Sequence, residues 1–192
     1  MELDSSRLAR LEAQADKAEI RECLTRFSRG MDRFDRVLYL SAFHADAVIA
    51  AGPYVGDVAG CYDWARPMHE TGQILTHHAL LNSTIEIAGD GAHSETYYLF
   101  VGRNRDETVW LAGGRYIDRV ERRAGPDGPE WKIALRTNVI EWGCLPPPMP
   151  IPFGDVVDIA LNGVSSRSTK DPSYTRPLIN RRQPSPPMGE PQ

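Results

Sequence analysis

The sequence predicts an α+β fold in which helices pack on one face of a strongly curved antiparallel sheet. Three observations support this prediction. Helical periodicity dominates the chain up to residue 72, long strand-like runs fill residues 75–142, and the turns between those runs are too short for crossover helices.

The first expected element is an amphipathic helix over residues 17–31. Its apolar side chains Ile20, Leu24, Phe27 and Met31 have the i, i+4, i+7, i+11 spacing of one helical face. A charged stretch precedes this helix. A shorter helical segment at 36–43, a β-branched segment at 46–55 and a second helical pattern at 57–72 follow it.

The later part of the chain predicts a run of hairpins. Turn sequences rich in Gly, Asn, Asp and Pro separate four strand-like runs, at about 75–87, 92–102, 108–122 and 131–142. We therefore expect a first domain over residues 1–143.

A proline-rich extension follows over residues 144–192. It holds 11 of the 15 prolines, a density that rules out continued sheet or helix. Residues 151–161 are still apolar, so we expect this first half to pack on the domain or a neighbouring subunit, and the last dozen residues to be loose.

The composition of this 192-residue chain is that of a soluble globular protein, with 41% hydrophobic and 25% charged residues. Its 26 acidic and 22 basic residues are interspersed, so we expect no nucleic-acid partner. The charged N-terminus and the lack of a long apolar run predict a cytoplasmic protein without a membrane segment. The three cysteines, Cys23, Cys61 and Cys144, indicate neither disulfides nor zinc. No nucleotide-binding, nucleophile-elbow or HExxH motif is present, and we expect no cofactor and no metal.

The candidate catalytic residues are Asp32 and His78. Asp32 directly follows the apolar helical stripe, where the negative end of the helix dipole disfavours a carboxylate. The alternative is a surface aspartate paired with Arg29 or Arg33. Strand alternation places His78, Leu80 and Asn82 on one face, so only one histidine of the His77–His78 pair can face a pocket. The alternative for His78 is a hydrogen-bonded core histidine.

Four further residues are candidates for substrate binding. Arg136 shares a strand face with Asn138, and it would hold a substrate oxygen or stabilise anionic charge. An outward-facing salt bridge is the alternative for Arg136. Tyr98 and Tyr54 combine an apolar body with a polar tip that suits an oxygenated ring, as do Tyr97, Trp110 and Tyr116.

Several of these residues stand in motifs that resemble the SnoaL-like branch of the nuclear transport factor 2-like superfamily. The motifs are FSRGMDRFD at 27–35, FHADA at 43–47, His78 with Asn82, and GRYIDR at 114–119. The resemblance covers roughly residues 10–143. It implies a cone-shaped sheet wrapped around the N-terminal helices, a pocket at the open end, and a homo-oligomer, either a trimer or a dimer.

The resemblance also implies an activity. Relatives such as scytalone dehydratase, hexachlorocyclohexane dehydrochlorinase and bile-acid dehydratase eliminate a small molecule with an Asp–His dyad, and Asp32 and His78 fall on the dyad positions. Arg136 looks like the active-site arginine of the dehydrochlorinase. Phe27 departs from the pattern, because relatives often carry a tyrosine or lysine there that assists the leaving group.

The chemistry of the two residues agrees with this assignment. Imidazole, with a pKa of about 6.5, is a better base at neutral pH than a free aspartate at about 3.9. We therefore expect a cofactor-independent lyase in which His78 removes a proton and Asp32 fixes its tautomer. The expected partner is a small, mostly apolar, hydroxylated aromatic or polycyclic substrate. The resemblance implies lignin-derived diarylpropanes as one such substrate class, because lyases that act on them belong to the same superfamily. A ketosteroid isomerase-like isomerase and a non-catalytic binding domain are the alternatives.

Overall fold

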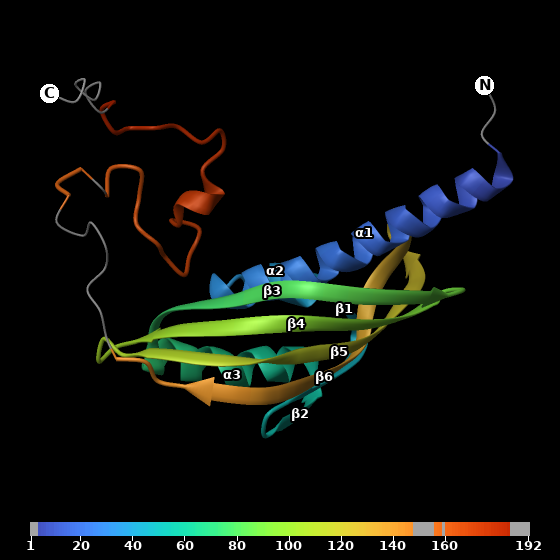
Figure 1. Ribbon diagram of the computed structural model, residues 1–192, viewed down its shortest axis with the longest axis horizontal. Helices are drawn as coiled ribbons and strands as arrows, with labels where there is room; N and C mark the ends of the chain where they lie inside the picture. Colours follow the sequence, from blue (N-terminus) through green and yellow to red (C-terminus); the bar gives the residue numbers. More distant parts are fainter. Residues whose placement is uncertain (1–3, 148–155, 159, 185–192) are drawn as a thin grey trace, which may run out of the picture.

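The computed structural model describes residues 4–147, 156–158 and 160–184. Six strands form one sheet in the order β2-β1-β6-β5-β4-β3, and three α-helices accompany it (Figure 1). In chain order the elements are α1 (Ser5–Asp32), α2 (Arg36–Ser41), β1 (Phe43–Ala51), β2 (Tyr54–Asp57), α3 (Val58–Gly72), β3 (Gln73–Ala88), β4 (Gly91–Asn104), β5 (Val109–Gly125), β6 (Gly128–Cys144) and a 3-10 turn (Pro172–Tyr174). The α+β prediction is confirmed.

Helix α1 combines the charged lead and the amphipathic segment into one 28-residue helix. Asp4 caps its start by accepting the Ser6 N–H. The first turns extend past the sheet edge, with exposed Leu8 and Leu11 (Figure 1). The predicted apolar stripe is buried in the second half of the helix.

The end of α1 lies tightly against α2. A Cβ at Gly30 would come within 2.5 Å of the Tyr39 backbone nitrogen, so only glycine permits this approach. The contact holds the last turn of α1, and Asp32 with it, under the sheet.

The four predicted strand runs correspond to β3, β4, β5 and β6, which pair in antiparallel order. The 46–55 segment becomes β1 and β2. Strand β1 pairs with β6 in parallel, with Ile49 opposite Arg136, so the complete sheet is mixed. The sequence analysis predicted only the hairpins and did not include this long-range pairing.

Register shifts bend the long strands. One lies between Gly113 and Gly114, where a Cβ on Gly114 would come within 2.0 Å of the Val139 carbonyl oxygen. Another lies between Leu80 and Ser83 in β3. Asn82 is exposed beside this second shift, so its predicted place beside His78 and Leu80 on the inner face is wrong, because the bulge interrupts strand alternation.

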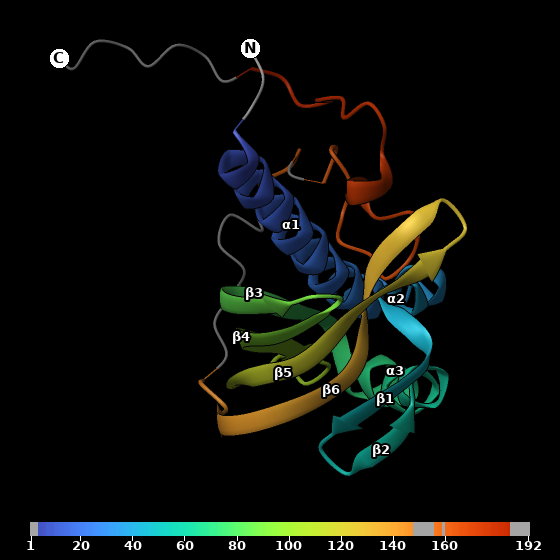
Figure 2. The same cartoon turned by 90° about the vertical axis from the view of Figure 1, so that its right-hand side faces the viewer.

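The sheet curls so that α1 and α3 lie on its concave side (Figure 2). Helix α3 begins at the cap Asp57, as the 57–72 pattern indicates, and buries Cys61, Ala65 and His69 at four-residue spacing. None of the described helices is long and apolar enough to span a membrane.

Part of the C-terminal extension packs beside the end of α1. Asp171 lies 3.4 Å from Arg33, and the Tyr174 hydroxyl donates a 3.0 Å hydrogen bond to Asp35. Arg167 donates to the His69 backbone oxygen. Residues 151–155 and 159 of the predicted packing segment and residues 185–192 of the predicted loose end lie outside the described residues, and Val157 is fully exposed.

Candidate active site

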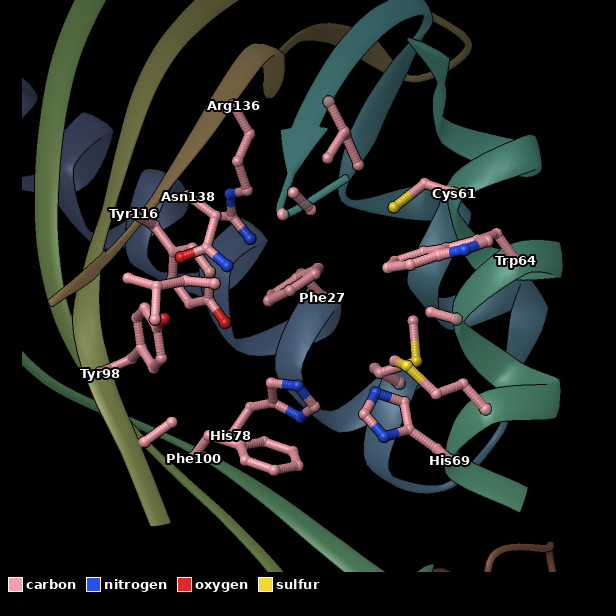
Figure 3. Close-up of a pocket in the computed structure, with 18 of the residues that line it drawn as sticks. Phe27, Cys61, Trp64, His69, His78, Tyr98, Phe100, Tyr116, Arg136 and Asn138 are labelled. Atoms are coloured by element: carbon pink, nitrogen blue, oxygen red, sulfur yellow. The ribbon is translucent and has the colours of Figure 1, made fainter. Parts of the chain in front are cut away.

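A cavity of about 280 Å³ opens between α1, α3 and the concave face of the sheet. Its walls are largely aromatic, and several polar side chains project from them (Figure 3). The aromatic residues include Phe27, Tyr39, Trp64, Phe100, Trp110 and Tyr116, and the polar ones are His69, His78, Tyr98, Arg136 and Asn138.

Asp32 and His78 form the predicted pair. The His78 Nδ1 lies 2.6 Å from Asp32 Oδ1, and the backbone N–H of His78 donates to Asp32 Oδ2 at 2.8 Å. The Thr76 hydroxyl donates a third hydrogen bond to Oδ1 at 3.0 Å. Both oxygens of the carboxylate are therefore held by the strand that carries His78.

These contacts explain how a carboxylate is stabilised at the C-terminus of a helix, where the helix dipole disfavours it. Asp32 is only 8% exposed. Burial by itself raises the pKa of its carboxyl, but His78 and the hydrogen bonds from His78 and Thr76 lower the pKa below its ordinary value. Asp32 is thus an ionised, buried carboxylate. The surface-aspartate alternative is wrong, and Arg33 pairs with Asp171 instead.

His78 lines the cavity, whereas Asp32 is outside the lining, behind the imidazole. With Nδ1 bonded to Asp32, the other ring nitrogen, Nε2, faces the cavity beside Phe27 (Figure 3). The Phe27 and Phe100 rings contact His78 edge-on, with centroids at 6.1 and 5.0 Å. His77 is exposed on the opposite face, as strand alternation predicts.

Arg136 is only 1% exposed and forms a two-point ion pair with Asp118, at 2.7 and 2.8 Å. Its guanidinium lies 4.1 Å from the ring centre of Phe27 and 4.3 Å from that of Tyr116. The alternative of an outward-facing salt bridge is wrong, because the pair points inward. Arg136 Nη1 has no hydrogen-bond partner among the residues that the structure describes.

Asn138 and Tyr98 lie near Arg136 on the cavity wall. The buried Asn138 Oδ1 likewise lacks a partner within the described part of the chain. Tyr98 stacks on Tyr116 with ring centres 4.4 Å apart, and burial raises the pKa of its hydroxyl, with Asn138 opposing part of that rise. Its neighbour Tyr97 is exposed, so Tyr98 is the tyrosine of the pair that faces the cavity.

Tyr54 is not among the cavity-lining residues, so the structure does not bring it together with the other predicted substrate-binding residues. Its hydroxyl donates to the Asp57 backbone oxygen, and its ring stacks on Trp64 at 5.7 Å. Tyr54 lies behind Trp64, because the short β2 strand leads directly into the α3 cap.

His69 is a cavity residue that the sequence interpretation missed. It is 6% exposed, and its Nδ1 lies 2.9 Å from the Gln73 side-chain oxygen. Burial lowers the pKa of His69 to about 4, although Gln73 opposes this effect, so the ring is neutral at pH 7. The spacing of His69 with Cys61 and Ala65 in the sequence indicates a buried helical face, but it does not distinguish the core from a cavity. Within the described ranges, no cluster of three His, Cys, Asp or Glu side chains could hold a metal ion.

Comparisons with known proteins agree with this architecture. Residues 12–137 match the family model described as the SnoaL-like domain. No curated protein sequence matches the chain. The similar solved structures include hexachlorocyclohexane dehydrochlorinase LinA type 2, with a TM-score of 0.65 and 20% identity over 74% of this chain and 97% of that one.

Two further similar structures come from Novosphingobium. LinA type 3 from Novosphingobium barchaimii has a TM-score of 0.64 and 17% identity over 74% of this chain and 99% of that one. A Novosphingobium aromaticivorans protein provisionally named a scytalone dehydratase has a TM-score of 0.60 and 18% identity over 73% and 95%. At such identities these likenesses show the shared fold. The family match spans most of the chain, including Asp32, His78 and Arg136, and the chain belongs to the SnoaL-like domain family.

Proposed function

We propose that this chain is a cofactor-independent lyase that eliminates a small molecule from a hydroxylated aromatic or polycyclic substrate. The observation that carries the proposal is the orientation of His78. Its Nδ1 is bonded to a buried carboxylate, and its Nε2 faces an apolar cavity. An imidazole held in this way can accept a proton and is stabilised by Asp32 once it is charged.

The two eliminations that we propose begin at Nε2. For loss of water, Nε2 takes a proton from carbon, the C–H electron pair forms a C=C bond, and hydroxide leaves and recovers the proton from the imidazolium. For loss of formaldehyde, Nε2 takes the proton of a primary alcohol, and the O–H electron pair becomes the C=O bond as a C–C bond breaks. The carbon that receives the electron pair then recovers the proton or expels a neighbouring hydroxyl as water.

Arg136 supports the development of negative charge on the substrate. It lines the cavity, and its Nη1 has no hydrogen-bond partner within the described part of the chain, whereas the unpartnered Asn138 Oδ1 can only accept a hydrogen bond. A guanidinium fixed by Asp118 needs no reorganisation when negative charge appears on a substrate oxygen. Phe27 offers no proton, so the imidazolium of His78 is the acid that we assign to the leaving group.

The cavity favours flat, apolar substrates that carry a few oxygens. Phe100, Trp110 and Trp64 supply aromatic surface, while the polar groups are few and fixed. The names of the structural neighbours, a dehydrochlorinase and a protein named as a scytalone dehydratase, agree with an elimination reaction. Lignin-derived diarylpropane diols combine two aromatic rings with the required hydroxyls, and we propose them as the first substrate class to test.

Mass spectrometry of a substrate panel tests this proposal. Diaryl diols and small aromatic alcohols are incubated with purified protein and no added cofactor, beside His78→Ala and His77→Ala. His77 is the matched control, because it is the exposed neighbour on the same strand. We expect a product lighter by water, by formaldehyde or by both with the parent protein and the control, and none with His78→Ala.

Other outcomes would contradict the proposed activity or the proposed role of His78. A new chromatographic peak of unchanged mass would identify an isomerase. Turnover that survives His78→Ala would remove the imidazole from the mechanism. A separation of Asp32 and His78 by more than about 6 Å, too far to couple, with neither residue in a pocket would favour the non-catalytic alternative. Their 2.6 Å contact and the place of His78 in the cavity lining do not meet that condition.

A further inference from the structure

The cavity contains a second imidazole, His69, whose free nitrogen faces the same space as that of His78. The two rings are 5.8 Å apart between centroids and nearly perpendicular, at 87°. Phe100 contacts both, with centroids 5.6 Å from His69 and 5.0 Å from His78. Figure 3 shows His69 projecting from α3 toward the cavity, opposite the strands.

A chain of hydrogen bonds fixes the tautomer of His69. Asn104 donates from its amide nitrogen to the Thr108 hydroxyl at 2.9 Å, which orients the Asn104 oxygen toward Gln73. Gln73 donates to that oxygen at 3.3 Å and therefore presents its own oxygen to His69 Nδ1 at 2.9 Å. An amide oxygen only accepts, so Nδ1 must carry the proton and Nε2 must carry the lone pair.

The fixed tautomer gives His69 a different capacity from that of His78. His78 is backed by a carboxylate that stabilises its protonated form, whereas His69 is backed by a neutral amide. Burial lowers the pKa of His69, and the nearby positive charges of Arg167 and, when protonated, His78 lower it further. His69 thus stays a neutral acceptor at pH 7.

We propose that His69 Nε2 is the binding point for a hydroxyl group of the ligand, and that it makes this cavity select a free phenol or alcohol over the corresponding methyl ether. This inference names a residue for substrate recognition in the proposed site, and its binding test does not require turnover. The buried acceptor gains a partner from a hydroxyl and is left unsatisfied by an ether, which is the arrangement that discriminates most strongly between such ligands.

The probes are 4-ethylphenol and 4-ethylanisole, which differ only in the O-methyl group. Their affinities are measured by quenching of tryptophan fluorescence, because Trp64 and Trp110 line the cavity. Four proteins are compared: the parent, His69→Phe, His78→Phe and His77→Phe. The parent should bind the phenol roughly tenfold more tightly than the ether, the range expected for one buried hydrogen bond.

The ratio of the two affinities, rather than either affinity, reports the role of His69. His69→Phe should bring the ratio close to one, and the exposed-site control His77→Phe should leave it unchanged. His78→Phe should also retain the preference, since the other imidazole remains. A ratio near one in the parent, a preference lost in His78→Phe but kept in His69→Phe, or failure of both probes to bind would each overturn the proposal.

A second measurement on the parent protein covers the case in which His69→Phe does not fold. Two-bond ¹H–¹⁵N correlation spectra assign the tautomer of each histidine. His69 should be protonated at Nδ1 at pH 7, and 4-ethylphenol should shift its Nε2 resonance more than 4-ethylanisole does. An Nε2-protonated ring, or equal shifts with both probes, would contradict the assignment. Absence of lyase activity would leave these binding results intact, so failure of the two proposals is distinguishable.

Discussion

The Asp32 carboxylate accepts from three groups of a single strand, namely the His78 ring, the His78 backbone and the Thr76 hydroxyl. At the scale of single residues this is the most constrained feature of the site. It determines at once where the imidazole lies and which of its nitrogens is free.

Asp32→Asn should reverse that choice of nitrogen. The amide oxygen must accept the His78 backbone N–H, which leaves the amide NH₂ facing His78 Nδ1 and puts the ring proton on Nε2. Turnover should fall by about 10²–10⁴, the usual contribution of a positioned base, while the free energy of unfolding falls by only about 1–2 kcal/mol.

Steady-state kinetics and urea unfolding check this pair of values. Asp63→Asn is the control, since the ion pair of Asp63 with Arg36 is exposed. Undiminished turnover in Asp32→Asn would show that the base does not depend on its carboxylate.

His69 should make the stability of the protein depend on pH. Its pKa is lowered from 6.5 to about 4 by burial, so between these values the unfolded chain binds a proton that the folded chain does not. Stability from this residue is therefore complete above pH 6.5 and falls by about 3 kcal/mol as the pH decreases to 4.

Urea unfolding at pH 7, 5.5 and 4.5 measures this slope for the parent and for His69→Phe. The variant should lose most of the decline over this range, because phenylalanine does not titrate. Parallel curves for the two proteins would rule out His69 as the source of the decline.

At the scale of elements, β5 and β6 are joined inside the core by the ion pair between Asp118 and Arg136. The two residues lie opposite each other in the sheet register. Burying a guanidinium costs stability unless a carboxylate accompanies it, so the pair must be kept or lost as a unit.

Asp118→Asn should therefore destabilise the fold by about 3–5 kcal/mol, because it leaves the Arg136 charge buried and unpaired. Glu95→Gln on the neighbouring strand is the control, since Glu95 pairs with a partly exposed Arg115 and should change stability by less than about 1 kcal/mol. Urea unfolding gives both values. Similar losses of stability in the two variants would show that the buried pair contributes no more than the partly exposed one.

The elements themselves could be predicted from the sequence because their signals are local. The stripe from Ile20 to Met31 and the hairpin turns each lie within one element or between two adjacent ones. The parallel pairing of β1 with β6 could not be predicted in this way, since it joins Ile49 to Arg136, which lie far apart in the sequence. The prediction that Asn82 shares a face with His78 and Leu80 was wrong because a bulge interrupts strand alternation.

The candidate site was predictable where one element determines the direction of a side chain. The helix end identified Asp32, and alternation distinguished His78 from His77 and grouped Arg136 with Asn138. His69 was missed because a histidine on a helical stripe gives no sign of whether it meets core or cavity. Tyr54 was misplaced because Trp64, which belongs to the following helix, occupies the position between it and the cavity.

At the scale of the whole molecule, the chain consists of the sheet with its helices and an extension that packs beside the end of α1. The family match ends at residue 137, before the extension begins. Tyr174 and Asp171 contact the turn that follows Asp32, and Arg167 contacts the end of α3.

Removal of residues 148–192 should leave the sheet folded but less stable. The loss of three hydrogen bonds and one ion pair between the described part of the extension and the domain predicts a decrease of about 1–3 kcal/mol in the free energy of unfolding. Circular dichroism and urea unfolding measure both properties. A truncated chain without cooperative unfolding would show that the extension is part of the folding unit.

Phe27 separates two charge systems inside the molecule. Its ring lies 4.1 Å from the Arg136 guanidinium and 6.1 Å from the His78 ring, between centroids. When His78 takes up a proton, each cation has its own buried carboxylate, Asp118 or Asp32, and both pairs are electrically neutral. Mobile ions outside screen such enclosed pairs only weakly. Turnover should therefore change little with ionic strength, and added salt would act mainly on the exposed ion pairs of the outer surface.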